Sequence, residues 1–144
     1  MNDAEVEYGD AGEVWEVVRK FESCEFADSE FTHGAHLTVA LCYLSSLTVE
    51  EATERMRVGL FRFLDHHGVD PKKYNETITL FWIRLVRGFL KRANPQRTLA
   101  DLANELVLTH GDSKIMFRYY SKELLMSDEA RKAWVEPDLK PFDF

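Results

Sequence analysis

Two histidines stand three residues apart in the stretch FTHGAHLTVALCYL, residues 31–44, and they are the first candidates for chemistry in this chain. If the stretch is a helix, His33 and His36 lie on one side of it, beside the apolar stripe that begins at Leu37. Neutral imidazole is a common ligand of zinc and iron, so the pair is a candidate metal site. The alternative is that one ring packs or caps the helix while the other is solvated.

Glu76, in the stretch KKYNETITLFW at residues 72–82, is the second candidate. A carboxylate in the first turn of a helix is stabilised by the helix dipole, and this alone can explain its presence. If the carboxylate is buried, it requires a cation, a metal or hydrogen-bond donors. Tyr74, Asn75 and Thr77 supply polar groups beside it, and we assign them as candidate substrate-binding residues.

Two imidazoles and one carboxylate from different helices would make a three-ligand set with open positions for water or substrate. We therefore expect His33, His36 and Glu76 to form the floor of a pocket that holds a small molecule or a divalent metal ion, zinc or iron. If the protein is an enzyme, Glu76 and His36 are the expected catalytic residues, through metal-activated water or general acid–base catalysis. The alternative function is a non-catalytic interaction module that forms a homodimer or binds another partner.

The elements that must position these residues are helices. Apolar residues recur at helical spacing, and threonines at positions 32, 48 and 98 are suitable N-caps. The predicted helices cover residues 12–22, 33–46, the stretch between Thr48 and Gly68, 74–91 and 99–110, with a further helix in SKIMFRYYSKELL and a short one in DEARKAW. No stretch shows strand alternation. We predict an all-α, single-domain antiparallel bundle of four to five main helices with an extended C-terminal tail, in which residues 1–10 are flexible and 11–144 form the domain.

Composition narrows the class of partner. The 144 residues carry a net charge of −7, which repels phosphate backbones and argues against nucleic-acid binding. The best local exception is a basic group on one helix, which we interpret as a solvated helix face: Arg84, Arg87, Lys91, Arg92 and Arg97. No apolar run reaches the ~18–20 residues of a membrane span, and the acidic start of the chain does not resemble a signal peptide. We expect a cytoplasmic protein that does not enter the membrane.

Three segments together resemble a family of small bacterial all-helical proteins without an established activity. They are FTHGAHLTVALCYL, YNETITLFW and the ending WVEPDLKPF, which are similar to FxHxxHLxxAWxYL, YHETxTxFW and WVEPDLxPL. The resemblance groups Trp82 with the two histidines, Tyr74, Glu76 and Thr77 as candidate site residues. This chain has Asn75 where the pattern has histidine, and Leu41 where it has tryptophan. Because asparagine is a poor ligand for zinc or iron, the first departure implies weaker metal binding or a different use of the pocket.

Overall fold

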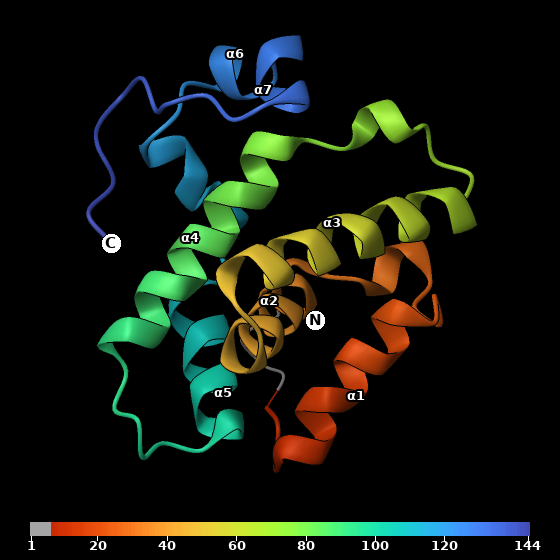
Figure 1. Cartoon of the computed structure of the whole chain (residues 1–144), viewed down its shortest axis with the longest axis vertical. Helices are drawn as coiled ribbons and strands as arrows, with labels where there is room; N and C mark the ends of the chain where they lie inside the picture. The colour runs from red at the N-terminus through yellow and green to blue at the C-terminus, as the bar shows by residue number, and fades with distance from the viewer. Residues whose placement is uncertain (1–6) are drawn as a thin grey trace.

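Helix α2 (His33–Ser46) lies at the centre of the protein and is apolar on nearly all sides. The computed structural model describes residues 7–144, and no strand occurs among them. Four other long helices contact α2 or one another and enclose it (Figure 1): α1 (Ala11–Glu22), α3 (Val49–His66), α4 (Glu76–Arg92) and α5 (Leu99–His110). A helix that is apolar all round has to be covered all round, which explains the central position of α2.

The starts of these helices are fixed by side-chain caps. Thr32, Thr48 and Thr98 each accept a hydrogen bond from the amide three residues later, as the sequence predicts. The cap of α4 is Asn75, whose Oδ1 accepts from the Ile78 amide at 3.0 Å. The helix therefore begins at Glu76, two residues later than the predicted start at position 74, because the capping residue has extended backbone geometry.

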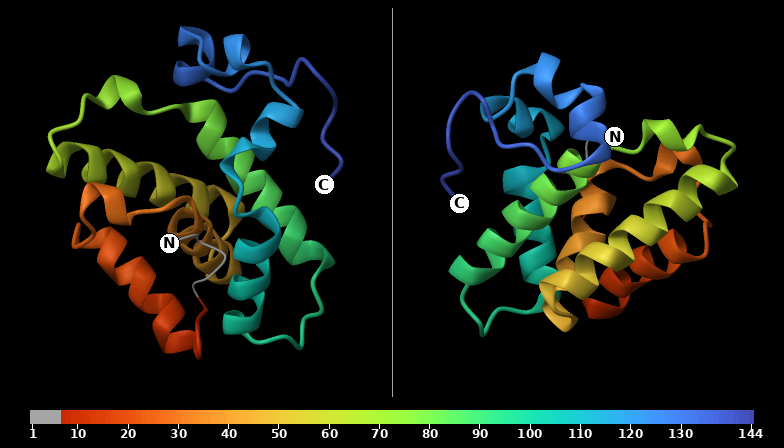
Figure 2. Two further views of the ribbon diagram at one scale, coloured as in Figure 1. Left: turned by 180° about the vertical axis from the view of Figure 1, so that it is seen from behind. Right: turned by 45° about the horizontal axis from the view of Figure 1, so that its top comes forward.

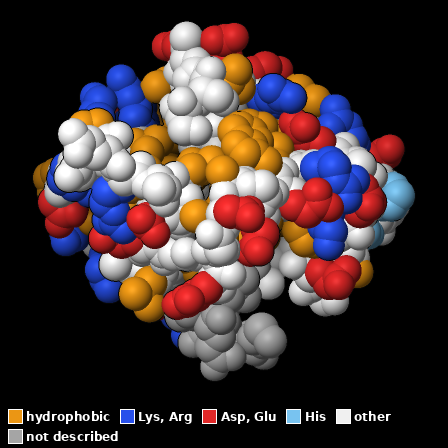
Figure 3. Space-filling model, turned by 90° about the horizontal axis from the view of Figure 1, so that it is seen from below, with side chains coloured by type: hydrophobic (Ala, Val, Ile, Leu, Met, Phe, Trp, Pro, Cys, Tyr) orange, Lys and Arg blue, Asp and Glu red, His pale blue; other side chains and the backbone are white. Residues whose placement is uncertain are grey.

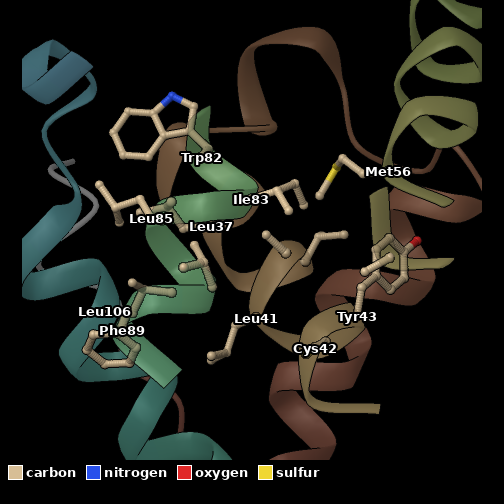
Figure 4. Close-up of a cluster of buried hydrophobic side chains, with 14 of the residues drawn as sticks. Leu37, Leu41, Cys42, Tyr43, Met56, Trp82, Ile83, Leu85, Phe89 and Leu106 are labelled. Atoms are coloured by element: carbon tan, nitrogen blue, oxygen red, sulfur yellow. The ribbon is translucent and has the colours of Figure 1, made fainter. Parts of the chain in front are cut away.

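The core fills the space between α2, α4 and α5 and extends to α3 (Figure 4). Leu37 and Leu41 of α2 lie close to Leu85 and Phe89 of α4 and to Leu106 of α5. All five side chains are less than a tenth exposed. Burial of such side chains supplies most of the favourable free energy of folding, about 1.5–3 kcal/mol each.

The last part of the chain is a set of short elements that lies over the start of α4 (Figure 2). It contains the 3-10 helix η4 (Ser113–Arg118), α6 (Lys122–Leu125), α7 (Asp128–Lys132) and an extended tail. The segment predicted as one helix over 113–125 is interrupted after residue 118. The tail explains the interruption, because the Leu139 amide donates to the carbonyl of Tyr119 at 2.9 Å and Asp138 accepts from Ser121.

The predicted all-α single-domain bundle with an extended C-terminal tail is confirmed by this arrangement. Of the segment predicted to be flexible, residues 1–6 lie outside the described residues. The backbone N–H of Tyr8 donates to Oδ1 of the Asn104 side chain, and the backbone carbonyl of Tyr8 accepts from Nδ2 of the same side chain. Among the described residues, no helix is both long enough and apolar enough to cross a membrane. Acidic and basic side chains are interspersed over the face shown in Figure 3.

Candidate functional site

The two candidate histidines lie in an aromatic environment at the start of α2. The His33 ring packs edge-on against Trp82, with ring centroids 4.3 Å apart. The His36 ring lies 6.0 Å from the Phe31 ring and 6.4 Å from the His33 ring. Burial, with a smaller contribution from the neighbouring His33, lowers the pKa of His36 to about 4. The His36 imidazole is therefore neutral at neutral pH.

Glu76 is bound by two other side chains. Its Oε1 accepts from Nε of Arg57 at 3.1 Å and its Oε2 accepts from Nη2 at 2.6 Å, which is a bidentate ion pair. The Tyr74 hydroxyl donates to the same Oε1 at 2.6 Å. The Glu76 side chain is only 17 % exposed. The need of this carboxylate for a partner is thus met by one cation and one hydroxyl donor.

These contacts fix the protonation states around Glu76. The Arg57 hydrogen bonds lower the pKa of Glu76, and the Tyr74 hydroxyl lowers it further. Burial, together with the adjacent carboxylate, raises the pKa of Tyr74 to about 12. At neutral pH the site therefore holds a carboxylate, a guanidinium and a neutral phenol, and neither Glu76 nor Tyr74 titrates near pH 7.

The histidines and Glu76 point to different surroundings. His33 contacts α4 at Trp82, six residues beyond Glu76, which corresponds to about 9 Å along the helix and about 120° around it. Between residues 7 and 144, no group of three or more His, Cys, Asp or Glu side chains is placed to hold a metal ion. The expected three-ligand set of His33, His36 and Glu76 is not assembled in this structure.

Three of the candidate substrate-binding residues have structural contacts instead. Asn75 caps α4 and also donates from Nδ2 to the Leu125 carbonyl at 2.8 Å. The Thr77 hydroxyl donates to the Ala133 carbonyl at 2.9 Å and accepts from the Val135 amide at 3.2 Å. Trp82 is 2 % exposed and belongs to the core. Asn75 and Thr77 thus fasten the C-terminal segment to the first turn of α4.

Glu76 and Tyr74 do line a cleft, which we call the Glu76 cleft. Its other walls come from α3, from the segment before α4 and from α7. The cleft has a volume of about 630 Å³, which is within the range of small-molecule sites. It is lined by Arg57, Phe61, Pro71, Lys72, Tyr74, Glu76, Asp128, Arg131 and Lys132. Four cationic side chains therefore face two carboxylates in a chain whose net charge is −7.

The cleft also has an aromatic wall. The rings of Phe61 and Tyr74 lie 4.4 Å apart at an angle of 32°. Phe61 is 40 % exposed, so part of its side chain is accessible to a ligand in the cleft. A flat apolar group of a ligand can pack on this ring pair while an anionic group meets Lys72 or Lys132, neither of which has an ion-pair partner among the described residues.

The sequence interpretation missed the residues that α3 and α7 bring to this cleft. Arg57 and Phe61 are four residues apart and so share a face of α3. This spacing predicts that they lie next to each other, but it does not predict that they lie next to Glu76. Arg131 and Lys132 lie more than fifty residues beyond Glu76, and no local pattern relates them to it.

No protein-family model, curated protein or solved structure matches this chain. The family resemblance of the three sequence segments therefore stays a prediction. The function has to be inferred from the geometry of the site.

Proposed function

We propose that the protein binds a small organic molecule in the cleft between α3, α4 and α7. The observation that carries this proposal is the combination of an exposed aromatic wall, Phe61 and Tyr74, with an excess of cationic side chains. Such a lining suits a ligand that has a flat apolar part and a carboxylate or another anionic group. The Arg57–Glu76 pair forms a rigid polar edge that orients the ligand.

The protonation states favour binding over general acid–base catalysis. An efficient general acid or base has a pKa near the working pH. Glu76 and His36 have lowered pKa values, and the pKa of Tyr74 is raised to about 12. Throughout the neutral range, Tyr74 therefore stays protonated, Glu76 stays deprotonated and His36 stays a neutral imidazole.

Aromatic carboxylates such as 4-hydroxybenzoate, each paired with its neutral amide, test the proposal by NMR titration. The carboxylates should bind more tightly than their neutral amide analogues. The backbone N–H signals of the protein that shift on titration should come from α3 around residue 61 and from α7. The F61A variant should weaken binding by about twofold to tenfold, from the 0.5–1.5 kcal/mol of an aromatic contact. Val58→Ala is the matched control, because Val58 is an exposed apolar residue of the same helix that does not line the cleft.

Two results would contradict the proposal. One is an equal loss of affinity in F61A and V58A. The other is that the backbone N–H signals that shift come from residues away from the cleft. Elemental analysis of protein purified without an affinity tag tests the metal alternative. Zinc or iron that is present in the wild type and lost from an H33A/H36A variant would favour a metal-dependent function instead.

A further inference from the structure

A second concave surface lies on the outer side of α4, between the start of α3 and the C-terminal tail. It has a volume of about 580 Å³. Its cationic residues are Arg84, Arg87, Lys91 and Arg92, and we call this surface the α4 groove. Positions 84, 87 and 91 have the spacing of one helix face, so their side chains form a row about 10 Å long.

The side chains that line the α4 groove do not balance its charge. No acidic side chain lines the groove, and none of its four cations has a carboxylate partner within residues 7–144. By contrast, Arg57 in the Glu76 cleft is paired with two carboxylates. Like charges held together on one helix face repel one another, and an anionic ligand would relieve this repulsion.

One of the cations is held in place without being neutralised. The guanidinium of Arg84 lies over the ring of Trp134, 4.0 Å from its centroid. This contact fixes the position of the planar group and leaves its charge intact. A guanidinium that is already ordered loses less entropy when it binds a phosphate or a carboxylate.

The opposite wall of the α4 groove is apolar. The rings of Phe142 and Phe144 are stacked, with centroids 5.0 Å apart and planes at 29°, and both line the groove with Val49. Gly88 permits this close approach of the tail, because a Cβ atom there would lie 3.3 Å from the main-chain carbon C of Phe144. The groove thus combines a cationic row with an aromatic wall.

We propose that the α4 groove binds a small organic phosphate, with two or more phosphate charges on the arginine and lysine row and a ring on the phenylalanine wall. Arginine predominates in the row, and its planar fork matches phosphate oxygens in a bidentate manner. The volume fits a nucleoside diphosphate or a ligand of similar size. This site is separate from the Glu76 cleft, and neither proposal depends on the other.

Calorimetric titration with ADP, inorganic pyrophosphate and adenosine tests the proposal. ADP should bind saturably and more tightly than either of the other two, and its affinity should fall as salt is added. An R87Q/K91Q variant should bind ADP at least about tenfold more weakly, because charge-assisted hydrogen bonds are lost. The control is K114Q/K122Q, which changes the net charge equally at exposed lysines outside the groove and should leave the affinity unchanged.

Three results would overturn the proposal. The first is the absence of saturable binding of ADP and pyrophosphate to a wild-type protein whose circular dichroism shows it to be folded. The second is an equal loss of affinity in the two double variants, which would show that ADP responds only to overall charge. The third is binding of oligoglutamate in place of ADP, which would assign the groove to an acidic protein partner. Equal affinities for pyrophosphate and ADP would remove the role given to Phe142 and Phe144.

Discussion

Arg57 holds both carboxylate oxygens of Glu76 with a single guanidinium, although the two residues are 19 positions apart on different helices. The pair connects the middle of α3 to the first turn of α4 and forms one edge of the Glu76 cleft. Because Glu76 is largely buried, the loss of its partner has a larger effect than the loss of an exposed ion pair.

Replacement of Arg57 by methionine should lower the free energy of unfolding by about 1–3 kcal/mol, since a buried acceptor loses its charged donor. Urea denaturation at neutral pH measures this difference. The R55M control removes a more exposed guanidinium from Glu22 and should change stability by less than about 1 kcal/mol. If Arg57 stabilises the protein through Glu76, R57M should have a smaller effect in an E76Q background; additive effects would contradict the pairing.

The lowered pKa of His36 predicts a loss of stability in mild acid. The unfolded chain takes up a proton at this ring near pH 6.5, whereas the folded protein does so only near pH 4. The unfolded state therefore binds more protons between these values, and stability falls as the pH drops through this window. Between pH 6.5 and about pH 5 the free energy of unfolding should decrease by about 1–2 kcal/mol through this group.

An H36Q variant should show a flatter dependence of stability on pH over the same range. NMR titration of the wild type should show the His36 ring protons unchanged down to about pH 5. His110, whose pKa is also lowered by burial, contributes in the same direction in both proteins. A His36 ring that titrates near pH 6.5 in the folded protein would refute the expected burial effect.

Asn75 has a role that aspartate can fill only in part. Asn75→Asp keeps the cap on Ile78 but replaces the donor to the Leu125 carbonyl with an acceptor. We expect a loss of about 1–3 kcal/mol, the penalty for a buried polar group without its partner. The comparison is Thr98→Ala at an exposed cap, which should lose about 1 kcal/mol. An N75D protein as stable as the wild type would show that the bond to Leu125 contributes nothing.

Gly59 is a site where the usual helix preference for alanine should be reversed. A Cβ atom at Gly59 would lie 2.5 Å from Cε2 of the Phe21 ring, which is fully buried between α1 and α3. Gly59→Ala should therefore lower stability by about 1–3 kcal/mol through overpacking, despite the intrinsic gain of about 1 kcal/mol. In a Phe21→Leu background the same change should be better tolerated. A G59A protein with a raised melting temperature would contradict this contact.

The sequence predicts the long helices well because their signals are local. Thr32, Thr48 and Thr98 cap helices at the predicted positions, since capping depends on residues within one turn. The break after residue 118 was not predictable in this way. Its cause is a hydrogen bond from Leu139, twenty residues away.

The candidate site shows the same division between local and distant contacts. The sequence indicates that a buried Glu76 needs a cation, a metal or donors, and Arg57 and Tyr74 fill that need. Tyr74 lies two residues before Glu76, and the sequence assigns it to the site, whereas Arg57 is identified only by how α3 crosses α4. The sequence also predicts ligand contacts for Asn75 and Thr77, which instead bind the chain's own C-terminal segment. No sequence feature of a polar residue at a helix start separates these two kinds of contact.

The double hydrogen bond of the Thr77 hydroxyl, to the carbonyl of Ala133 and from the amide of Val135, has a consequence for synthesis on the ribosome. Thr77 is fully buried in the complete fold, and until the segment around residue 135 has left the exit tunnel its hydroxyl can hydrogen-bond only to water. Asn75 can cap α4 as soon as its first turn has emerged, but the C-terminal segment can close over that turn only after residues translated almost sixty codons later are free.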